Sequence, residues 1–293
     1  MEKHIITDLQ EIMARCYHQV LVGQRREDNL FIPECAGSAF LFAYQDKIFL
    51  ISAEHVVSPS NEYFKLSPDK NYVGALYTNK IIKTPDNKIA AEMVSFNIDK
   101  DDFTTYYRWD NAAKQMFVER VDMFYYPISD NSQFAGKTFL TIGQEDSNGN
   151  IKYKGLQKIV VNEQCIAEPN KEHLYAIQGI VQLSSRGNQL VGKTVLHHSM
   201  SYISEVDGKY FLSISKQDEF IDTLKYWSGL SGAAVYDQTT GQIIGIATKY
   251  YEDELKLEVI SMKQIRVILD GYLKSRLLNS CTFTTMPQVY STV

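Results

Sequence analysis

Short apolar runs separated by turn residues recur along most of the chain, and this pattern restricts the fold more than any other feature. Residues 37–44 and 47–52 are two such runs, and Tyr44-Gln45-Asp46-Lys47 joins them as a β-hairpin turn would. Near the other end, Gly241 separates the runs 233–237 and 242–250. Short strands without alternating helices predict an all-β barrel or sandwich, and the 19 Tyr and 14 Phe favour strands as well.

The same reasoning extends over the remaining chain. Residues 97–118 are polar and aromatic without a clean period, so they are expected to form an insertion or a long connection. The other predicted strands are 18–23, 72–77, 90–96, 122–128, 137–142, 151–161, 174–184, 209–215 and 255–260.

Helical periodicity appears only at the two ends of the chain. Residues 3–17 place Leu9, Met13 and Cys16 on one face, which predicts an amphipathic helix. Its apolar face is expected to pack on the body of the protein, with a partner-binding helix as the open alternative. Residues 262–278 form the second predicted helix, and the Ser/Thr-rich stretch 279–293 is expected to be a flexible tail.

Charge and cysteine usage exclude several classes of function. A net charge of −5 without a Lys/Arg block argues against nucleic-acid binding. No stretch reaches the roughly 20 apolar residues of a membrane span, and no signal peptide is evident, so a cytoplasmic protein with reduced thiols is expected. The four cysteines contain no Cys-X-X-Cys, and the adjacent His197 and His198 would point to opposite faces of a strand. Neither a metal nor a cofactor is therefore expected.

A serine between glycines is the strongest chemical signal. Gly229-Leu230-Ser231-Gly232 is followed by Ala233-Ala234-Val235-Tyr236. Backbone N–H groups near a serine in such a loop can bind an oxyanion, although a tight turn between two strands is the alternative. No histidine follows Ser231, which excludes the Ser–acid–His order of the α/β-hydrolases.

His55 is the histidine with the most informative setting. It follows the apolar run 49–51 and the small residues Ser52 and Ala53. A histidine at the end of a strand is held by a packed element and reachable by solvent. The alternative is a hydrogen-bonded histidine at a sheet edge.

Four segments together resemble a known family. They are residues 37–41 (Gly-Ser-Ala-Phe-Leu), 50–57 (Leu-Ile-Ser-Ala-Glu-His-Val-Val), 229–235 (Gly-Leu-Ser-Gly-Ala-Ala-Val) and 241–247 (Gly-Gln-Ile-Ile-Gly-Ile-Ala). Over residues 18–262 the chain resembles the trypsin-like (chymotrypsin-fold) serine peptidases, particularly the intracellular bacterial kind. The resemblance implies a double β-barrel with the active site between the barrels. The first barrel would span 18–132 and the second 133–261, with helices 1–17 and 262–278 and the tail 279–293 outside them.

The resemblance also implies roles for individual residues. His55 would be the general base, Ser231 the nucleophile and Asp122 the orienting acid of a triad. Backbone N–H groups of Gly229 and Ser231 would form the oxyanion hole. Residues 139–143 resemble the opening strand of the second barrel, and a substrate backbone would pair with Ile246, Ala247 and Thr248. The aspartates that compete with Asp122 are Asp101, Asp102 and Asp110.

Three departures from the family pattern keep two functions open. Leu230 stands where secreted members carry an aspartate for zymogen activation, Ala233-Ala234 replaces Gly-Pro, and Glu54 replaces a small residue. The first function is a serine endopeptidase acting on a peptide or protein. The second is a non-catalytic module that binds a peptide or protein partner through the same cleft. A regulatory protein partner is an open expectation, and Lys225 lies near the expected base of the substrate side-chain pocket.

Overall fold

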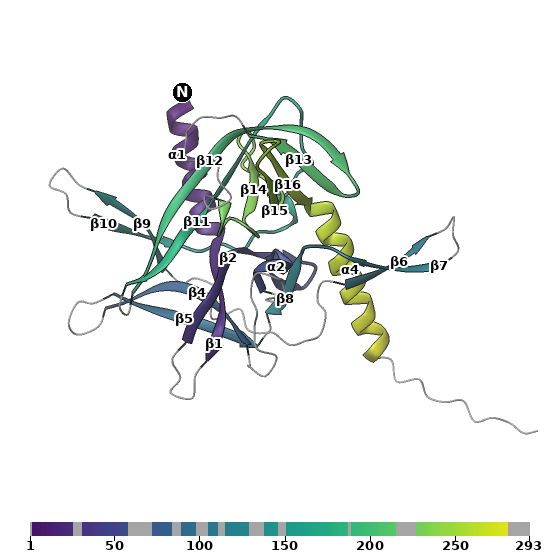
Figure 1. Cartoon of the computed structure of the whole chain (residues 1–293), viewed down its shortest axis with the longest axis horizontal. Coiled ribbons are helices and arrows are strands. Elements are labelled where there is room, and N and C mark those ends of the chain that lie inside the picture. Colours follow the sequence, from purple (N-terminus) through teal and green to yellow (C-terminus); the bar gives the residue numbers. More distant parts are fainter. Residues whose placement is uncertain are drawn as a thin grey trace, which may run out of the picture.

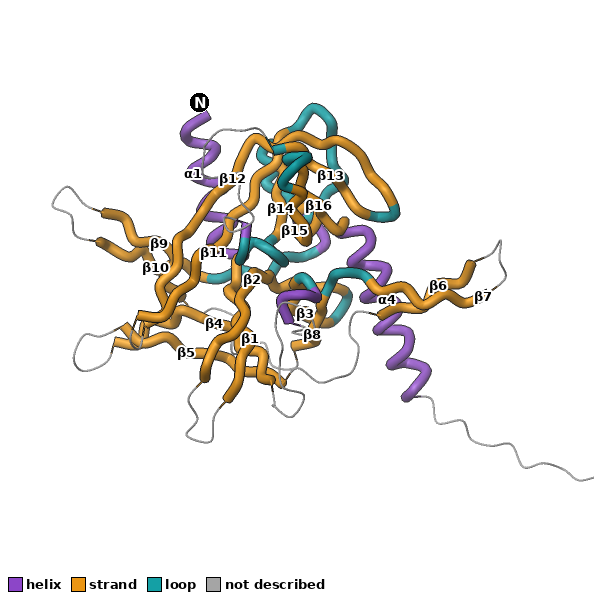
Figure 2. The backbone as a smooth tube through the Cα atoms, in the orientation of Figure 1, coloured by secondary structure: helices purple, strands orange, loops and turns teal. Residues whose placement is uncertain are grey.

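The computed structural model describes residues 2–25, 31–57, 72–83, 89–97, 105–110, 115–128, 138–145, 151–186, 189–214 and 227–280. Strands make up most of these residues, and the two long helices α1 (Glu2–Cys16) and α4 (Met262–Ser280) lie on opposite sides of the barrel strands in this view, with the short α2 (Glu54–Val57) near the centre (Figures 1 and 2). None of the described helices is long and apolar enough to cross a membrane.

The first half of the chain forms an antiparallel sheet of eight strands. Their order is β10-β9-β4-β1-β2-β3-β8, with β5 paired to β4. The predicted hairpin is present, because Tyr44 pairs with Lys47 at the β2–β3 turn. The strands are β1 (Tyr17–Arg25), β2 (Phe31–Tyr44), β3 (Lys47–Ser52), β4 (Tyr72–Lys83), β5 (Ile89–Asn97), β8 (Phe124–Ile128), β9 (Thr138–Glu145) and β10 (Ile151–Gln157).

The second half forms a closed barrel with the strand order β11-β12-β13-β16-β15-β14. Its strands are β11 (Leu174–Arg186), β12 (Gln189–Val206), β13 (Lys209–Ser213), β14 (Ala234–Asp237), β15 (Ile243–Tyr251) and β16 (Lys256–Ser261). The mostly β architecture with a closed barrel is confirmed. A second closed barrel, in the first half, stays a prediction.

Strand pairing differs from the sequence expectation at one place. Residues 139–143 were expected to open the second barrel, but β9 pairs with β10 and, through Phe139 and Lys80, with β4. The closed barrel instead begins at Leu174. A local apolar pattern predicts that a strand forms, but it carries no information about which distant strand will be its neighbour.

Two regions contain strands that the sequence pattern missed. The long β12 contains the polar run His197-His198-Ser199, and its register shifts opposite β11 and β13, so the alternation of period two is lost. Inside the predicted long connection, β6 (Thr105–Asp110) and β7 (Gln115–Arg120) form a separate two-stranded sheet. This hairpin projects away from the main body (Figure 1).

The two terminal helices are present as predicted. They are α1 (Glu2–Cys16) and α4 (Met262–Ser280). Leu9, Met13 and Cys16 of α1 are buried in a core cluster, so this helix packs on the body of the protein as expected.

That core cluster joins the two halves of the molecule. It contains Phe40 and Phe42 from the first sheet together with Tyr236 and Ile246 from the barrel, and all four side chains are buried. Burying a large apolar side chain stabilises the fold by about 1.5–3 kcal/mol. The shared core therefore fixes the barrel against the end of β3, where the candidate site lies.

Candidate active site

His55 and Asp122 come from neighbouring strands of the first sheet. His55 lies in the single-turn helix α2 (Glu54–Val57) directly after β3, and Asp122 lies two residues before β8. Ser52 pairs with Phe124 between these strands. This pairing brings the end of one strand beside the start of the other, although the two residues are 67 positions apart in the sequence.

The two side chains form a close hydrogen-bonded pair. His55 Nδ1 is 2.8 Å from Asp122 Oδ2 and 3.0 Å from Oδ1. The backbone N–H of His55 also donates to Asp122 Oδ1 at 3.0 Å. The Asp122 carboxylate thus fixes both the imidazole ring and the backbone of His55, while each of the two side chains stays 31% exposed.

Charge around His55 favours its protonated form. Burial alone would lower the pKa of the imidazole. The hydrogen bond to Asp122 and the negative charges of Asp122 and Glu54 outweigh burial, so the pKa of His55 is raised above its ordinary value of 6.5. Glu54, one of the departures from the family pattern, therefore acts on the histidine beside it.

The structure places Asp122, one of the four candidate aspartates, beside His55. Asp101 and Asp102 lie outside the described residues, and the side chain of Asp110 is not described. Lys225, the candidate at the base of the substrate pocket, also lies outside them.

The loop carrying Ser231 is held by its own backbone and by β15. Leu230 N donates to Trp227 O at 3.0 Å, Ala233 N to Leu230 O at 2.9 Å, and Gly232 N to Ala247 O at 2.7 Å. Gly229 and Gly232 have φ values of +106° and +83°, in the left-handed region that favours glycine.

Close approaches of the backbone also require these two glycines. A Cβ on Gly229 would lie 2.4 Å from Ile180 O, and a Cβ on Gly232 would lie 2.1 Å from Ser38 O. Both distances are far below ordinary contact, so a larger residue at either position would displace the loop.

The Ser231 loop rests directly on the strands that lead to His55. Ser38 N donates to Ser231 O at 2.8 Å, and Ser38 Oγ donates to Gly229 O at 2.6 Å. A Cβ on Gly232 would lie 2.8 Å from the backbone nitrogen of Ala53, two residues before His55. Within the described part of the chain, however, no hydrogen bond reaches the Ser231 hydroxyl, so none joins it to the His55 ring.

Within the segment 229–233, two backbone donors make no hydrogen bond to the described residues. The hydrogen bonds within the loop and to β15 engage the N–H groups of Leu230, Gly232 and Ala233. The N–H groups of Gly229 and Ser231 make no hydrogen bond among the described residues. These are the donors that the sequence assigned to an oxyanion hole.

The predicted substrate strand is only partly accessible. Ile246 lies between Ala234 of β14 and Ile260 of β16, while Ala247 donates to Ala233 O at 2.9 Å and accepts from Gly232 N. These two residues therefore have no free backbone edge. Beyond Ala247, β15 pairs with β16 only, so Thr248 alone of the three predicted residues lies on the edge that is open among the described strands.

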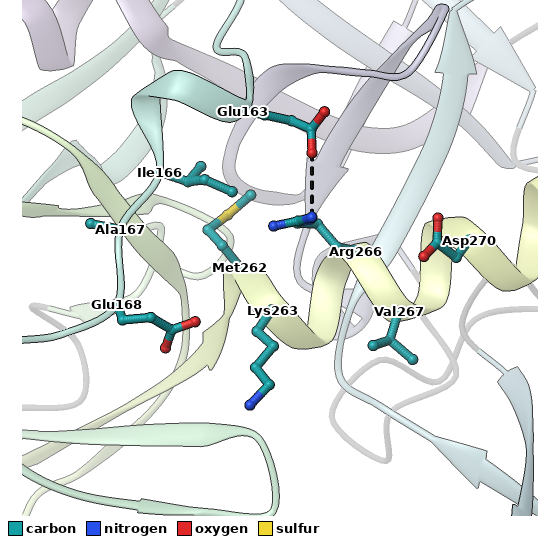
Figure 3. Close-up of a pocket in the computed structure, with 9 residues that line it drawn as sticks. All are labelled: Glu163, Ile166, Ala167, Glu168, Met262, Lys263, Arg266, Val267 and Asp270. Atoms are coloured by element: carbon teal, nitrogen blue, oxygen red, sulfur yellow. Dashed lines mark ion pairs between the residues drawn. The ribbon is translucent and has the colours of Figure 1, made fainter.

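The structure also contains a pocket that sequence reasoning did not find. It has a volume of about 410 Å³ and lies between the segment of the 3₁₀ turn η2 (Glu163–Cys165) and α4. Figure 3 shows the ion pair between Arg266 and Glu163 across it, with an Nη2–Oε1 distance of 3.5 Å. Its lining residue Asp270 accepts a 2.7 Å hydrogen bond from Tyr44, at the opposite end of β3 from His55. The pocket is therefore separate from the Ser231 loop.

Within the described ranges, no group of three or more His, Cys, Asp and Glu side chains is arranged to hold a metal ion.

Comparisons with known proteins found no matching family model and no matching curated protein. A serine endoprotease from Yersinia pestis is similar in structure, with 13% identity and a TM-score of 0.40 over 92% of this chain and 67% of that one. A catalytically inactive tobacco etch virus protease in complex with substrate has 10% identity and a TM-score of 0.39 over 90% of this chain and 86% of that one. Values this low carry no argument about this chain, so the functional argument rests on the geometry of the site.

Proposed function

We propose that the protein is a serine endopeptidase in which Ser231 is the nucleophile, His55 the general base and Asp122 the acid that orients the base. The observation that carries this proposal is the 2.8 Å contact between His55 Nδ1 and Asp122 on the strands against which the Ser231 loop is docked. A nucleophile beside an oriented base is the signature of covalent catalysis.

Each group has a defined task in this reaction. Asp122 holds the proton on His55 Nδ1, which leaves Nε2 free to take the proton of the Ser231 hydroxyl. The oxygen of Ser231 attacks the peptide carbonyl, and the N–H groups of Gly229 and Ser231 stabilise the resulting oxyanion. The protonated imidazole gives its proton to the leaving amine, and water then releases the acyl group from Ser231.

An extended substrate would add to the barrel as a strand. Among the described strands, the open edge of β15 starts at Thr248, directly after the residue that binds Gly232. Main-chain hydrogen bonds along such an edge supply affinity in peptide recognition by strand addition. A hydrogen bond between the Ser231 hydroxyl and His55 would form when substrate arrives, because catalytic contacts often tighten only in the complex.

A non-catalytic binding module is the second candidate. The observation that favours it is the lack of a hydrogen bond on the Ser231 hydroxyl among the described residues, together with Leu230 and Ala233-Ala234 in the loop. Such a module would hold a peptide on the same strand edge without attacking it.

Labelling by a small fluorophosphonate, followed by intact-mass measurement, separates the two candidates. The wild type is expected to gain one adduct, and Ser231→Ala and His55→Ala are expected to gain none. Ser228→Ala is the matched control, because Ser228 is an exposed serine of the same loop, and it should label like the wild type. A folded wild type that gains no adduct would favour the binding module.

A further inference from the structure

One residue of the first sheet binds two carbonyls of the Ser231 loop. Ser38 of β2 donates from its hydroxyl to Gly229 O at 2.6 Å and from its backbone N–H to Ser231 O at 2.8 Å. Ser38 is 0% exposed, and Gly229 is buried as well. Buried carbonyls need a hydrogen-bond donor, and among the described residues the Ser38 hydroxyl is the donor for Gly229 O.

These two hydrogen bonds lie on either side of the peptide unit that carries the Ser231 N–H. That unit joins Leu230 to Ser231, and its carbonyl, Leu230 O, accepts from Ala233 N at 2.9 Å. Gly229 O belongs to the preceding peptide unit, and Ser231 O belongs to the following one. The hydrogen bonds of Ser38 and Ala233 therefore hold consecutive peptide units, with the Ser231 N–H between the two units that Ser38 binds.

The Ser38 hydroxyl supplies a restraint that Gly229 itself does not. Gly229 has a φ of +106°, and glycine adopts many backbone conformations at little steric cost. The rotation of the peptide unit after Gly229 therefore needs a restraint from outside the loop. Because the hydroxyl holds Gly229 O against β2, this carbonyl does not turn toward a developing oxyanion, whose negative charge it would oppose.

Ser38 is held in turn by the strand that leads to His55. Ser52 Oγ donates to Ser38 O at 2.8 Å, and Ser52 is 0% exposed. Ser52 ends β3, directly before the segment that carries His55. The two buried serines thus connect the loop that contains the candidate oxyanion donors to the strand that leads to the candidate base.

We propose that Ser38, held by Ser52, is a positioning residue that orients the oxyanion donors at Gly229 and Ser231 through its hydrogen bond to the Gly229 carbonyl. This inference rests on the proposed endopeptidase function. Donors fixed in advance stabilise the transition state rather than the bound substrate. Loss of the Ser38 hydroxyl should therefore lower kcat and leave KM nearly unchanged.

Steady-state kinetics of Ser38→Ala test this inference. Removing a whole oxyanion donor costs about 10²–10³ in kcat, so misaligned donors are expected to cost about 10–100-fold with a fluorogenic alanyl ester. KM should stay within about twofold of the wild-type value, because the lost interaction acts mainly in the transition state.

The second readout is the inhibition constant of a peptidyl trifluoromethyl ketone. In its complex Ser231 Oγ bonds to the ketone carbon, the hydroxyl proton passes to His55, and the ketone oxygen becomes an oxyanion. This adduct resembles the transition state. The inhibition constant of Ser38→Ala should therefore rise by the same factor by which kcat/KM falls.

Ser261→Ala is the matched control. Ser261 is also 0% exposed, and its hydroxyl accepts from Gln264 N at 3.0 Å at the start of α4. Its replacement should lower stability but leave kcat and the inhibition constant unchanged. Equal losses of kcat in the two variants would show a general effect of removing a buried serine hydroxyl and would overturn the positioning role.

The remaining outcomes separate this inference from the proposed function. A folded Ser38→Ala with wild-type kcat and inhibition constant would overturn the inference, while fluorophosphonate labelling of the wild type would keep the endopeptidase assignment. A wild type that neither hydrolyses the ester nor labels would overturn both. Where Ser38→Ala fails to fold, Ser52→Ala decides, since it removes the hydrogen bond that holds Ser38 O. Its kcat should fall without a change in KM, and an unchanged kcat would overturn the inference.

Discussion

The described part of the chain contains two aspartate–histidine pairs of nearly equal geometry in different surroundings. His55 Nδ1 lies 2.8 Å from Asp122, and His173 Nδ1 lies 2.7 Å from Asp237. Both side chains of the first pair are partly exposed, each at 31%. In the second pair the carboxylate is 2% exposed and the imidazole 24%.

The remaining hydrogen bonds distinguish the two pairs. Asp237 also accepts from the backbone N–H groups of Thr239 at 2.8 Å and Thr240 at 3.2 Å, so it shapes the turn after β14. The second ring nitrogen of His173 lies 3.4 Å from the amide nitrogen of Asn170. The whole pair is thus engaged in holding the start of β11 against this turn.

The comparison shows that a short Asp–His contact alone does not indicate a catalytic base. The Ser231 loop is docked on the strands that carry His55, whereas His173 is joined to Asn170 and Asp237. We therefore expect changes in the first pair to affect activity and changes in the second pair to affect stability.

The largest difference should come from the histidines. His55→Ala is expected to lower kcat by on the order of 10⁶, since members of a triad act as a unit. His173→Ala should keep kcat near the wild-type value. Turnover of a fluorogenic alanyl ester measures both variants. Retained activity in His55→Ala, or its loss in a folded His173→Ala protein, would reverse the assignment of the pairs.

The two aspartates should differ in the same way as the two histidines, with a smaller effect on kcat. Asp122→Asn is expected to lower kcat by on the order of 10⁴, because an amide that donates to Nδ1 stabilises the wrong tautomer of the base. Asp237→Asn should cost about 1–3 kcal/mol of unfolding free energy, since it weakens hydrogen bonds of a buried carboxylate, and should leave kcat nearly unchanged. Urea denaturation and ester turnover provide the two measurements. Near wild-type turnover in Asp122→Asn would assign the acid elsewhere.

The smallest predicted effect concerns pH. His55 acts as a base only when unprotonated, and its raised pKa predicts that kcat/KM rises with pH through a midpoint above 6.5. Glu54→Gln removes one of the charges that raise this pKa, so the midpoint should move to lower pH. Glu172→Gln, which removes an exposed charge beside His173, is the matched control and should leave the profile in place. An unchanged profile in Glu54→Gln would contradict the electrostatic role of Glu54.

Much of the secondary structure was predictable because its signals are local. The period of residues 3–17 predicted a helix, and α1 spans Glu2–Cys16. Runs such as 47–52 coincide with a strand, β3. The predictions failed where bulges disturb the alternation, as in β12, and where the partner of a strand had to be chosen, as in β9.

The candidate site was predictable in part for the same reason. His55 and Ser231 stand in recognisable local sequences, but Asp122 had competitors until the pairing of β3 with β8 placed it beside His55. The substrate-binding role of Ile246, Ala247 and Thr248 stays a prediction, and the structure adds that the backbones of Ile246 and Ala247 are already bonded on both sides. No sequence signal indicated that the Ser38 hydroxyl binds Gly229 O.

The amino-acid sequence by itself therefore determined the local elements and the candidate reactive residues, since periodicity, glycine positions and residue chemistry act over a few neighbours. Only the tertiary structure decided which distant residues contact one another. The contacts Ser38–Gly229, His55–Asp122 and Tyr44–Asp270 join residues 191, 67 and 226 positions apart. Contacts at such separations form only when the whole chain packs around a shared core, because closing these loops costs entropy that no local segment can offset.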